Sequence, residues 1–126
     1  MVQLLVIGIG GFLGAIARFG ITTLIHRNES HGFPFGTMVA NVLGCFLMGI
    51  LVYLIQEKEV LPPMTRGFLL VGLLGALTTF STFSLETVRL MQTGQWVFAF
   101  TNVLTSVLFC LGALMLGRLF VKWIAA

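Results

Sequence analysis

The sequence contains few charged residues for its length. Only 9% of its 126 residues are Asp, Glu, Lys or Arg, whereas 58% are hydrophobic, and the mean hydropathy is +1.07. A water-soluble domain needs more polar surface than this composition offers. The net charge of +3 is spread as single residues near the ends of apolar runs, which is typical of headgroup anchors and disfavours nucleic acid as a partner. The composition predicts an integral membrane protein whose main partner is the lipid bilayer.

Cysteine and histidine are also scarce, with two residues of each. Cys45 and Cys110 lie inside apolar runs and lack the close spacing of a metal or redox pair, so we interpret them as small core residues. His26 and His31 fall in a polar connection, with no acidic or cysteine partner at catalytic spacing. We therefore expect neither an enzyme nor an organic cofactor.

Four apolar runs are each long enough to cross a membrane, which takes about 20 helical residues. They cover residues 2–25, 35–55, 66–90 and 96–121, and the connections between them are short and contain Pro, Gly or polar residues. Because only helices and closed barrels satisfy their backbone in lipid, we expect an all-α membrane protein, a single four-helix transmembrane domain over residues 1–126.

The positive charges are divided almost evenly between the two membrane faces. Four helices would place both termini on one side. The side of the termini then holds Lys58, Arg66, Arg118 and Lys122, and the other side holds Arg18, Arg27 and Arg89. Because an excess of Lys and Arg sets orientation, so small an excess leaves two interpretations open. The chain has either one weakly biased orientation or both orientations.

Small residues mark the expected contact faces of the first two helices. Gly10 with Gly14, and Gly11 with Ala15, are one turn apart, a spacing that favours close helix packing in membranes. The second helix carries a similar file of Gly36, Ala40 and Gly44.

Polar side chains recur at membrane depth in several runs. Thr37 and Asn41 lie one turn apart on the second helix, and Asn102 and Ser106, with Thr105 beside them, form a patch on the fourth. An interhelical hydrogen bond of about 0.6 kcal/mol would explain any one of them. Patches on several helices favour a polar pathway instead.

The third run is the most informative. Gly72 and Gly75 precede a group of hydroxyl residues, Thr78, Thr79, Ser81 and Thr82. Glycine weakens a helix, and hydroxyls can bond to backbone carbonyls, so we expect a break near the middle of this helix. Irregular backbone at this depth must be buried or line a polar cavity, and its freed carbonyls can coordinate a small cation.

Three further side chains have two interpretations each. Phe80 and Phe83 place their rings on one side of the third helix, where they pack against lipid or core, or else present positively charged ring edges to an anion. Arg18 lies well within the first span and either extends to the headgroups or attracts anions at a vestibule.

Three segments, GGFLGAIARF (10–19), NVLGCFLMG (41–49) and GLLGALTTFSTF (72–83), together resemble the Fluc fluoride channels, also called the CrcB family. The last segment is the most specific. The resemblance implies a four-helix subunit with an interrupted third helix, assembled as an antiparallel, dual-topology homodimer with two pores. It also implies a multi-pass protein of the bacterial inner membrane that passes fluoride ions passively out of the cell.

The resemblance further implies roles for individual residues. Asn41 corresponds to a pore donor, Phe80 and Phe83 to an aromatic pair along the fluoride path, and Ser81 and Thr82 to a polar track. Thr37 and Arg18 fit vestibule positions, and Gly75 and Thr78 match the carbonyls that hold a structural sodium ion at the dimer centre. Asn102 and Ser106 are pore candidates from the residues alone. Two positions depart from the family pattern: Phe19 stands where Tyr is common, and Ala76 where a second Gly is common.

A passive pore would suffice for fluoride export. Hydrogen fluoride enters a cell as a neutral acid and dissociates there, and a negative interior adds about 2.3 kcal/mol per 100 mV for an anion that leaves. The alternative is a proton-coupled exporter of small organic cations, of the small multidrug type. That chemistry needs a membrane-embedded carboxylate. Glu86, the one embedded acid, lies near the end of its span and three residues from Arg89, so we interpret the two as a structural ion pair.

Overall fold

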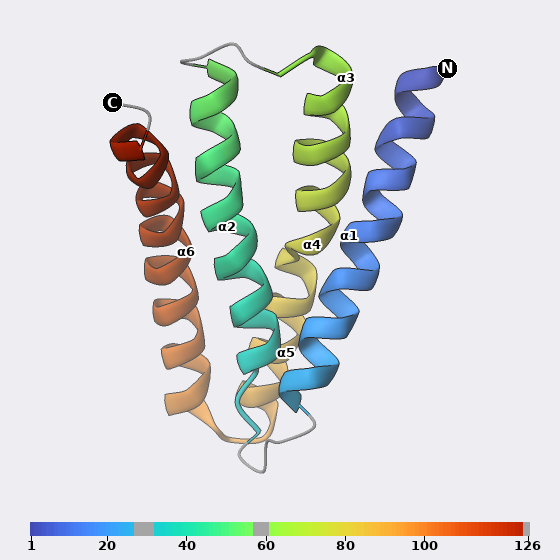
Figure 1. Ribbon diagram of the computed structural model, residues 1–126. Coiled ribbons are helices and arrows are strands. Elements are labelled where there is room, and N and C mark those ends of the chain that lie inside the picture. The colour runs from blue at the N-terminus through green and yellow to red at the C-terminus, as the bar shows by residue number, and fades with distance from the viewer. Residues whose placement is uncertain (27–31, 57–60, 125–126) are drawn as a thin grey trace.

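The computed structural model describes residues 1–26, 32–56 and 61–124, and every regular element within them is helical (Figure 1). Three spans are continuous: α1 (Val2–His26), α2 (Phe35–Gln56) and α6 (Trp96–Ile124). The third span consists of α3 (Pro63–Arg66), the π-helical segment η1 (Gly67–Leu74), α4 (Gly75–Leu77) and α5 (Phe80–Gln92).

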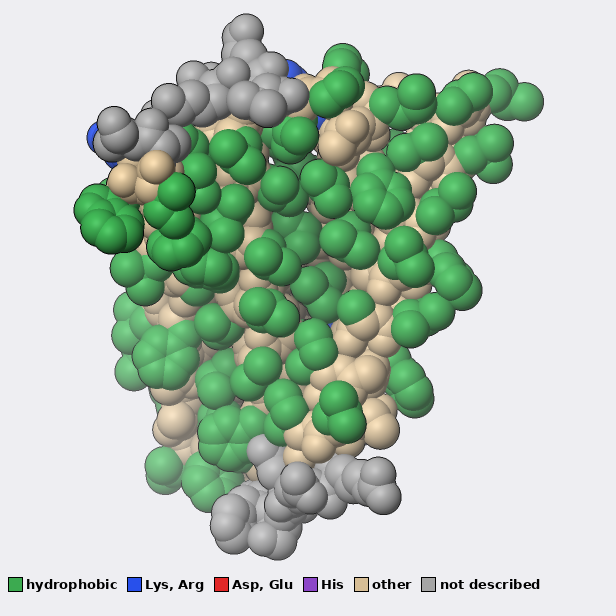
Figure 2. All heavy atoms as spheres, in the orientation of Figure 1, with side chains coloured by type: hydrophobic (Ala, Val, Ile, Leu, Met, Phe, Trp, Pro, Cys, Tyr) green, Lys and Arg blue, Asp and Glu red, His purple; other side chains and the backbone are tan. Residues whose placement is uncertain are grey.

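Four helical spans are long and apolar enough to cross a membrane. They are Val2–Ile25, Phe35–Ile55, Pro63–Gln92 and Trp96–Ile124, with mean hydropathies of 1.8 to 2.3. Hydrophobic side chains cover the face seen in Figure 2 almost from end to end. These findings confirm the predicted all-helical, multi-pass membrane protein.

Both chain ends lie at the same end of the bundle (Figure 1). α1 packs against η1 and α4, while α2 packs chiefly against α6. His26 is the last residue of α1, which corrects its assignment to the connection. Three of the residues used above, Arg27, His31 and Lys58, lie outside the described part of the chain.

Close packing between α1 and the third span depends on glycine. A Cβ atom at Gly14 would meet the Leu73 carbonyl, and one at Gly72 would meet the carbonyl of Ile7. A Cβ atom at Gly11, by contrast, would have no described neighbour within 4 Å. The Gly10–Gly14 face is therefore a packing face, whereas Gly11 has no such close neighbour among the described residues.

The third span changes its backbone geometry twice. The N–H of Gly75 donates to the carbonyl of Leu70, five residues earlier, as a π-helix requires. After α4 ends at Leu77, Thr78 and Thr79 adopt extended backbone conformations, with φ/ψ of −85°/147° and −148°/115°. α5 then begins at Phe80, which places two non-helical residues within the span.

Candidate functional site

Asn41 connects α2 to the two extended residues of the third span. Its Oδ1 accepts a hydrogen bond from the Thr79 N–H at 2.7 Å, and its Nδ2 donates to the Thr79 carbonyl at 3.3 Å. Backbone groups that leave a helix inside a membrane must find other partners, and one side-chain amide here serves both groups of Thr79. One of the two Nδ2 protons that Asn41 could offer to an anion as a pore donor is thus already used.

The hydroxyl of Thr79 begins α5. Its Oγ1 accepts a hydrogen bond from the Thr82 N–H at 3.2 Å, as an N-cap residue does. The same oxygen lies 3.1 Å from the Thr82 hydroxyl and 3.2 Å from that of Ser81. The predicted polar track is therefore a hydrogen-bonded cluster at the start of a helix.

These two sets of hydrogen bonds release two particular carbonyls. In a continuous helix the N–H of Thr79 would bond to Gly75 and the N–H of Thr82 would bond to Thr78. Instead the first donates to Asn41 and the second to the Thr79 side chain. The carbonyls of Gly75 and Thr78 lose their usual helical donors, so the backbone chemistry fits a small hard cation such as sodium.

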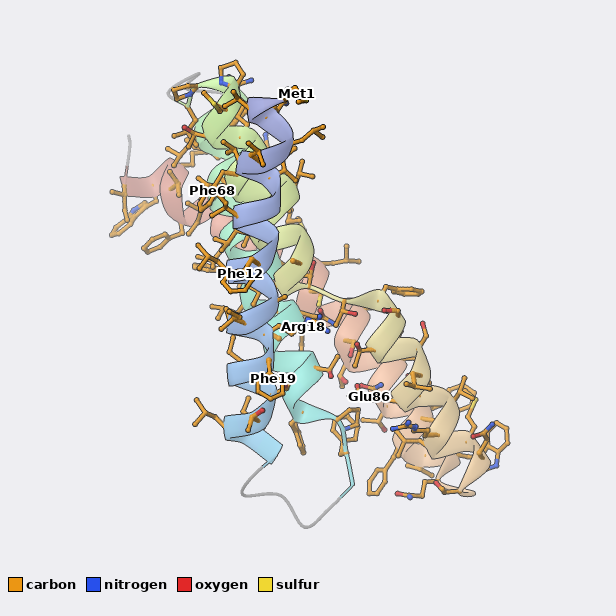
Figure 3. All side chains as sticks on the ribbon, turned by 90° about the vertical axis from the view of Figure 1, so that its right-hand side faces the viewer. Met1, Phe12, Arg18, Phe19, Phe68 and Glu86 are labelled. Atoms are coloured by element: carbon orange, nitrogen blue, oxygen red, sulfur yellow. The ribbon has the colours of Figure 1, made fainter. Side chains whose placement is uncertain are left out.

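Arg18 extends from α1 toward this same region (Figure 3). Its Nε donates to the Ala76 carbonyl at 3.1 Å, and its Nη1 lies 3.5 Å from the Thr82 hydroxyl. The side chain is half-buried. The guanidinium therefore bonds to the third span, a contact that neither interpretation of Arg18 predicted.

We call the space between α1, α2 and α5 the polar cavity; its volume is about 600 Å³. Its wall contains charges of both signs, Arg18 and Glu86, and Thr37 Oγ1 donates to Glu86 Oε1 at 2.7 Å. Figure 3 shows Arg18 on α1 and Glu86 on α5 facing the same region. The lining residues are Arg18, Thr22, Thr23, Thr37, Thr79, Thr82 and Glu86.

A second cavity, the phenylalanine groove, lies between α2, the start of α5 and α6 and measures about 400 Å³. The rings of Phe80 and Phe83 line it with centroids 5.4 Å apart and planes inclined at 44°. Phe80 is 79% exposed in the single chain, and Phe83 is half-buried. Asn41, Thr78 and Ser106 also line this groove, and Thr79 lines both cavities.

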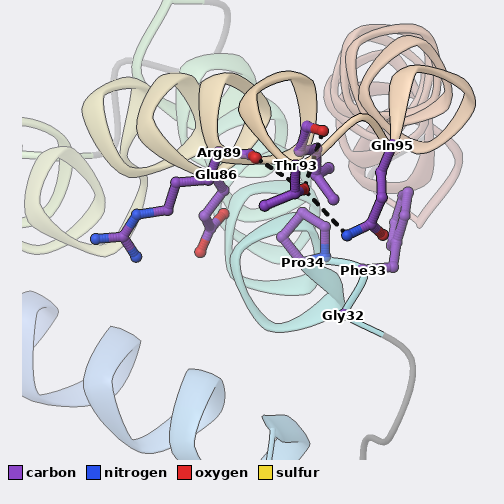
Figure 4. A pocket seen from close by; sticks show the side chains of 8 residues that line it. Gly32, Phe33, Pro34, Glu86, Arg89, Thr93 and Gln95 are labelled. Atoms are coloured by element: carbon purple, nitrogen blue, oxygen red, sulfur yellow. Dashed lines mark hydrogen bonds between the residues drawn. The ribbon is translucent and has the colours of Figure 1, made fainter.

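A third cavity of about 340 Å³ lies beside the turn between α5 and α6 (Figure 4). Arg89 and Glu86 contribute to its wall, and Gln95 Nε2 donates to the Thr93 hydroxyl at 3.1 Å. We call it the end cavity. It shares Glu86 with the polar cavity, as the polar cavity shares Thr79 with the phenylalanine groove.

The comparisons with known proteins identify the family. A family model described as "CrcB-like protein, Camphor Resistance (CrcB)" matches residues 5–118. The chain belongs to this family.

Three relatives of this CrcB-like chain are each named "Fluoride-specific ion channel FluC". The Ruminiclostridium cellulolyticum protein is 43% identical over 126 residues, which is all of this chain and 97% of the relative. The Magnetococcus marinus protein is 45% identical over 91% of this chain and 94% of the relative. The Shewanella pealeana protein is 48% identical over 94% of each chain.

The candidate residues of this CrcB-like chain fall into separate groups. Asn102 lines none of the three cavities: it is 1% exposed, its Nδ2 donates to the Thr87 hydroxyl at 2.9 Å, and its Oδ1 accepts from Ser106 at 3.3 Å. The bond to Thr87 joins α5 to α6, and the bond from Ser106 lies within α6. Ser81 is exposed and also lies outside the three cavities.

Two features of the structure were not predicted. Glu86 was interpreted as a structural ion-pair partner of Arg89 and considered as a transporter carboxylate, yet it contributes to the walls of two cavities. Cys45 and Cys110 are not isolated core residues: both are half-buried and both line the phenylalanine groove. Their separation in sequence concealed this pairing, because two parallel helices bring distant positions into register.

Proposed function

We propose that this chain forms a passive fluoride channel. The observation that carries the proposal is the match, over 91% or more of the chain, with relatives named fluoride-specific ion channels. The geometry supports it, because hydroxyl donors, an amide and two ring edges gather around a helix interruption at membrane depth. The name of these relatives also disfavours the two alternatives, an exporter of organic cations and an enzyme.

Two of the three cavities suggest a route for the ion. An anion would enter the polar cavity on its Arg18 side and meet the Thr82 hydroxyl there. Thr79, which lines both cavities, leads on to the phenylalanine groove. Arg18 would raise the local anion concentration, and Thr79 would be the narrow point of the route.

The same proposal assigns a structural sodium ion to the carbonyls of Gly75 and Thr78. Gly75 is exposed in the single chain, so an ion bound there would be enclosed only by a second subunit. Two copies related by a twofold axis would supply a set of backbone oxygens without any acidic ligand.

We further propose that two chains assemble antiparallel in the bacterial inner membrane. The even distribution of Lys and Arg supports insertion in both orientations. A partner would also cover Phe80, which the single chain leaves 79% exposed. Fluoride would leave the cell down the membrane potential, without ATP or a coupled ion.

Reconstituted vesicles test the function directly. Liposomes that contain the protein and are loaded with potassium fluoride should release fluoride when valinomycin carries the counter-ion, and liposomes loaded with chloride should not release chloride. An ion-selective electrode records both fluxes. Equal fluoride and chloride release would contradict a fluoride channel, and efflux of an organic cation such as methylviologen would favour the exporter.

The aromatic pair gives a residue-level test of the same proposal. We expect Phe80→Ile and Phe83→Ile each to lower fluoride flux by about tenfold or more, equivalent to about 1.4 kcal/mol, because the ring edges rather than the side-chain volume face the ion. Phe100→Ile is the matched control, since Phe100 is 72% exposed and lines none of the three cavities. Normal fluoride flux in both variants would show that the two rings only pack against lipid or neighbouring side chains and do not face the ion.

A further inference from the structure

Two thiols line the phenylalanine groove at the same level. Cys45 comes from α2 and Cys110 from α6. The two helices pack closely one turn further on, where a Cβ atom at Gly49 would meet the Leu114 carbonyl. Gly49 and Leu114 lie four residues after Cys45 and Cys110, so the parallel helices place the two cysteines side by side. The pair is therefore held between two rigid helices.

The surroundings of the pair are apolar on one side. Met48, one turn from Cys45, adds a thioether to the same wall beside Val107 and Leu114, and the polar residues Asn41 and Ser106 lie one turn away on the other side. Sulfur ligands select soft metal ions. In the described part of the chain no cluster of three or more His, Cys, Asp or Glu residues exists. Zinc, which usually takes four such ligands, would therefore bind weakly at this pair.

The net charge of the bound site further restricts which metal ion could bind. An uncompensated charge is expensive in an apolar membrane protein. A soft divalent ion that accepts two ligands in a line, as the mercuric ion does, leaves no net charge when both ligands are thiolates. Each metal–sulfur bond replaces one sulfur–hydrogen bond, so binding releases two protons to solvent.

We propose that Cys45 and Cys110 form a binding site for a soft divalent d¹⁰ cation of the mercuric type. An ion bound there lies in the groove that Phe80, Phe83 and Asn41 also line. This second consequence rests on the proposed function: mercuric ion should block fluoride flux by occupying the groove.

Binding is measured first, independently of transport. Reduced protein in detergent is titrated with mercuric nitrate, and the thiolate–mercury absorption band and the released protons are followed together. We expect one ion and two protons per chain, and no response to zinc. Cys45→Ser and Cys110→Ser should each release one proton per ion and bind at least about 100-fold more weakly, since even loss of an outer-shell partner costs 10–100-fold. Met48→Leu, the matched control, should still release two.

The outcomes separate the site from the channel. Two ions per chain with one proton each, or no binding, would overturn the site, and the unsubstituted protein alone decides this if the serine variants fail to fold. Binding with two protons and uninhibited fluoride flux would overturn the blocking role. If the unsubstituted protein conducts no fluoride, the proposed function fails while the proton count still tests the site. The variant without either cysteine should conduct fluoride in the presence of mercuric ion.

Discussion

A single amide illustrates how this protein uses its few polar side chains. Asn41 is 8% exposed and bonds to both backbone groups of Thr79. Its neighbour one turn away, Thr37, contacts Glu86 in a different cavity. Periodicity predicted that these two residues share a helix face, and it could not predict their partners, because those depend on how α5 is rotated against α2.

Replacement of Asn41 by Asp should abolish conduction. Aspartate keeps an acceptor for the Thr79 N–H but places an oxygen opposite the Thr79 carbonyl, which leaves a buried carbonyl unsatisfied at about 1–3 kcal/mol. A negative charge would also repel the anion. We expect fluoride flux from vesicles to fall to background and the unfolding midpoint in detergent to decrease.

The control for this variant is Gln92→Glu, which makes the same change of amide to carboxylate at an exposed residue outside the three cavities. It should conduct normally. If Asn41→Asp lowers stability and still conducts fluoride, Asn41 only ties α2 to the third span, and the pore lies elsewhere.

At the scale of the helices, apolar runs and turn residues determined most of what could be predicted. All four predicted spans lie within a few residues of the observed ones, because Pro, Gly and polar residues mark their ends. The π-helical geometry of η1 was not predicted. Its residues, GFLLVGLL, are as apolar as a regular helix, and the extra residue per hydrogen bond leaves no periodic signal in so short a segment.

Two glycines on α1 test the helix packing as a matched pair. Gly14→Ala places a methyl group against the Leu73 carbonyl, and such overpacking costs about 1–3 kcal/mol. Gly11→Ala meets open space, so it should leave stability unchanged or raise it slightly. Tryptophan fluorescence during unfolding by increasing SDS in mixed micelles compares the two. Equal loss of stability in both variants would show that α1 does not pack on η1 through the Gly10–Gly14 face.

At the scale of the whole molecule, the described basic residues divide between the two ends of the bundle. Arg66, Arg118 and Lys122 lie on the elements near the chain ends, and Arg18 and Arg89 lie toward the opposite end. Among the described residues, neither end therefore gathers more than three basic side chains. The sequence alone predicted this division, since it depends only on the number of spans, whereas the three cavities and the residues that they share became visible only once the helices were placed in space.

This near balance makes the orientation of the chain easy to bias. In a background without Cys45 and Cys110, a single cysteine in a tag after Ala126 should react with an impermeant maleimide in about half of the chains in whole cells, and in all of them after lysis.

Three lysines added to the same tag should retain the chain ends in the cytoplasm. An antiparallel dimer could not then form, so cells with this variant alone should lose fluoride resistance. Co-expression with a variant biased the opposite way, by lysines in the turn at Gly94, should restore resistance, because the two fixed orientations together rebuild the antiparallel pair. Labelling from one side only, or full resistance with the lysine-tagged variant alone, would show that the subunits are parallel.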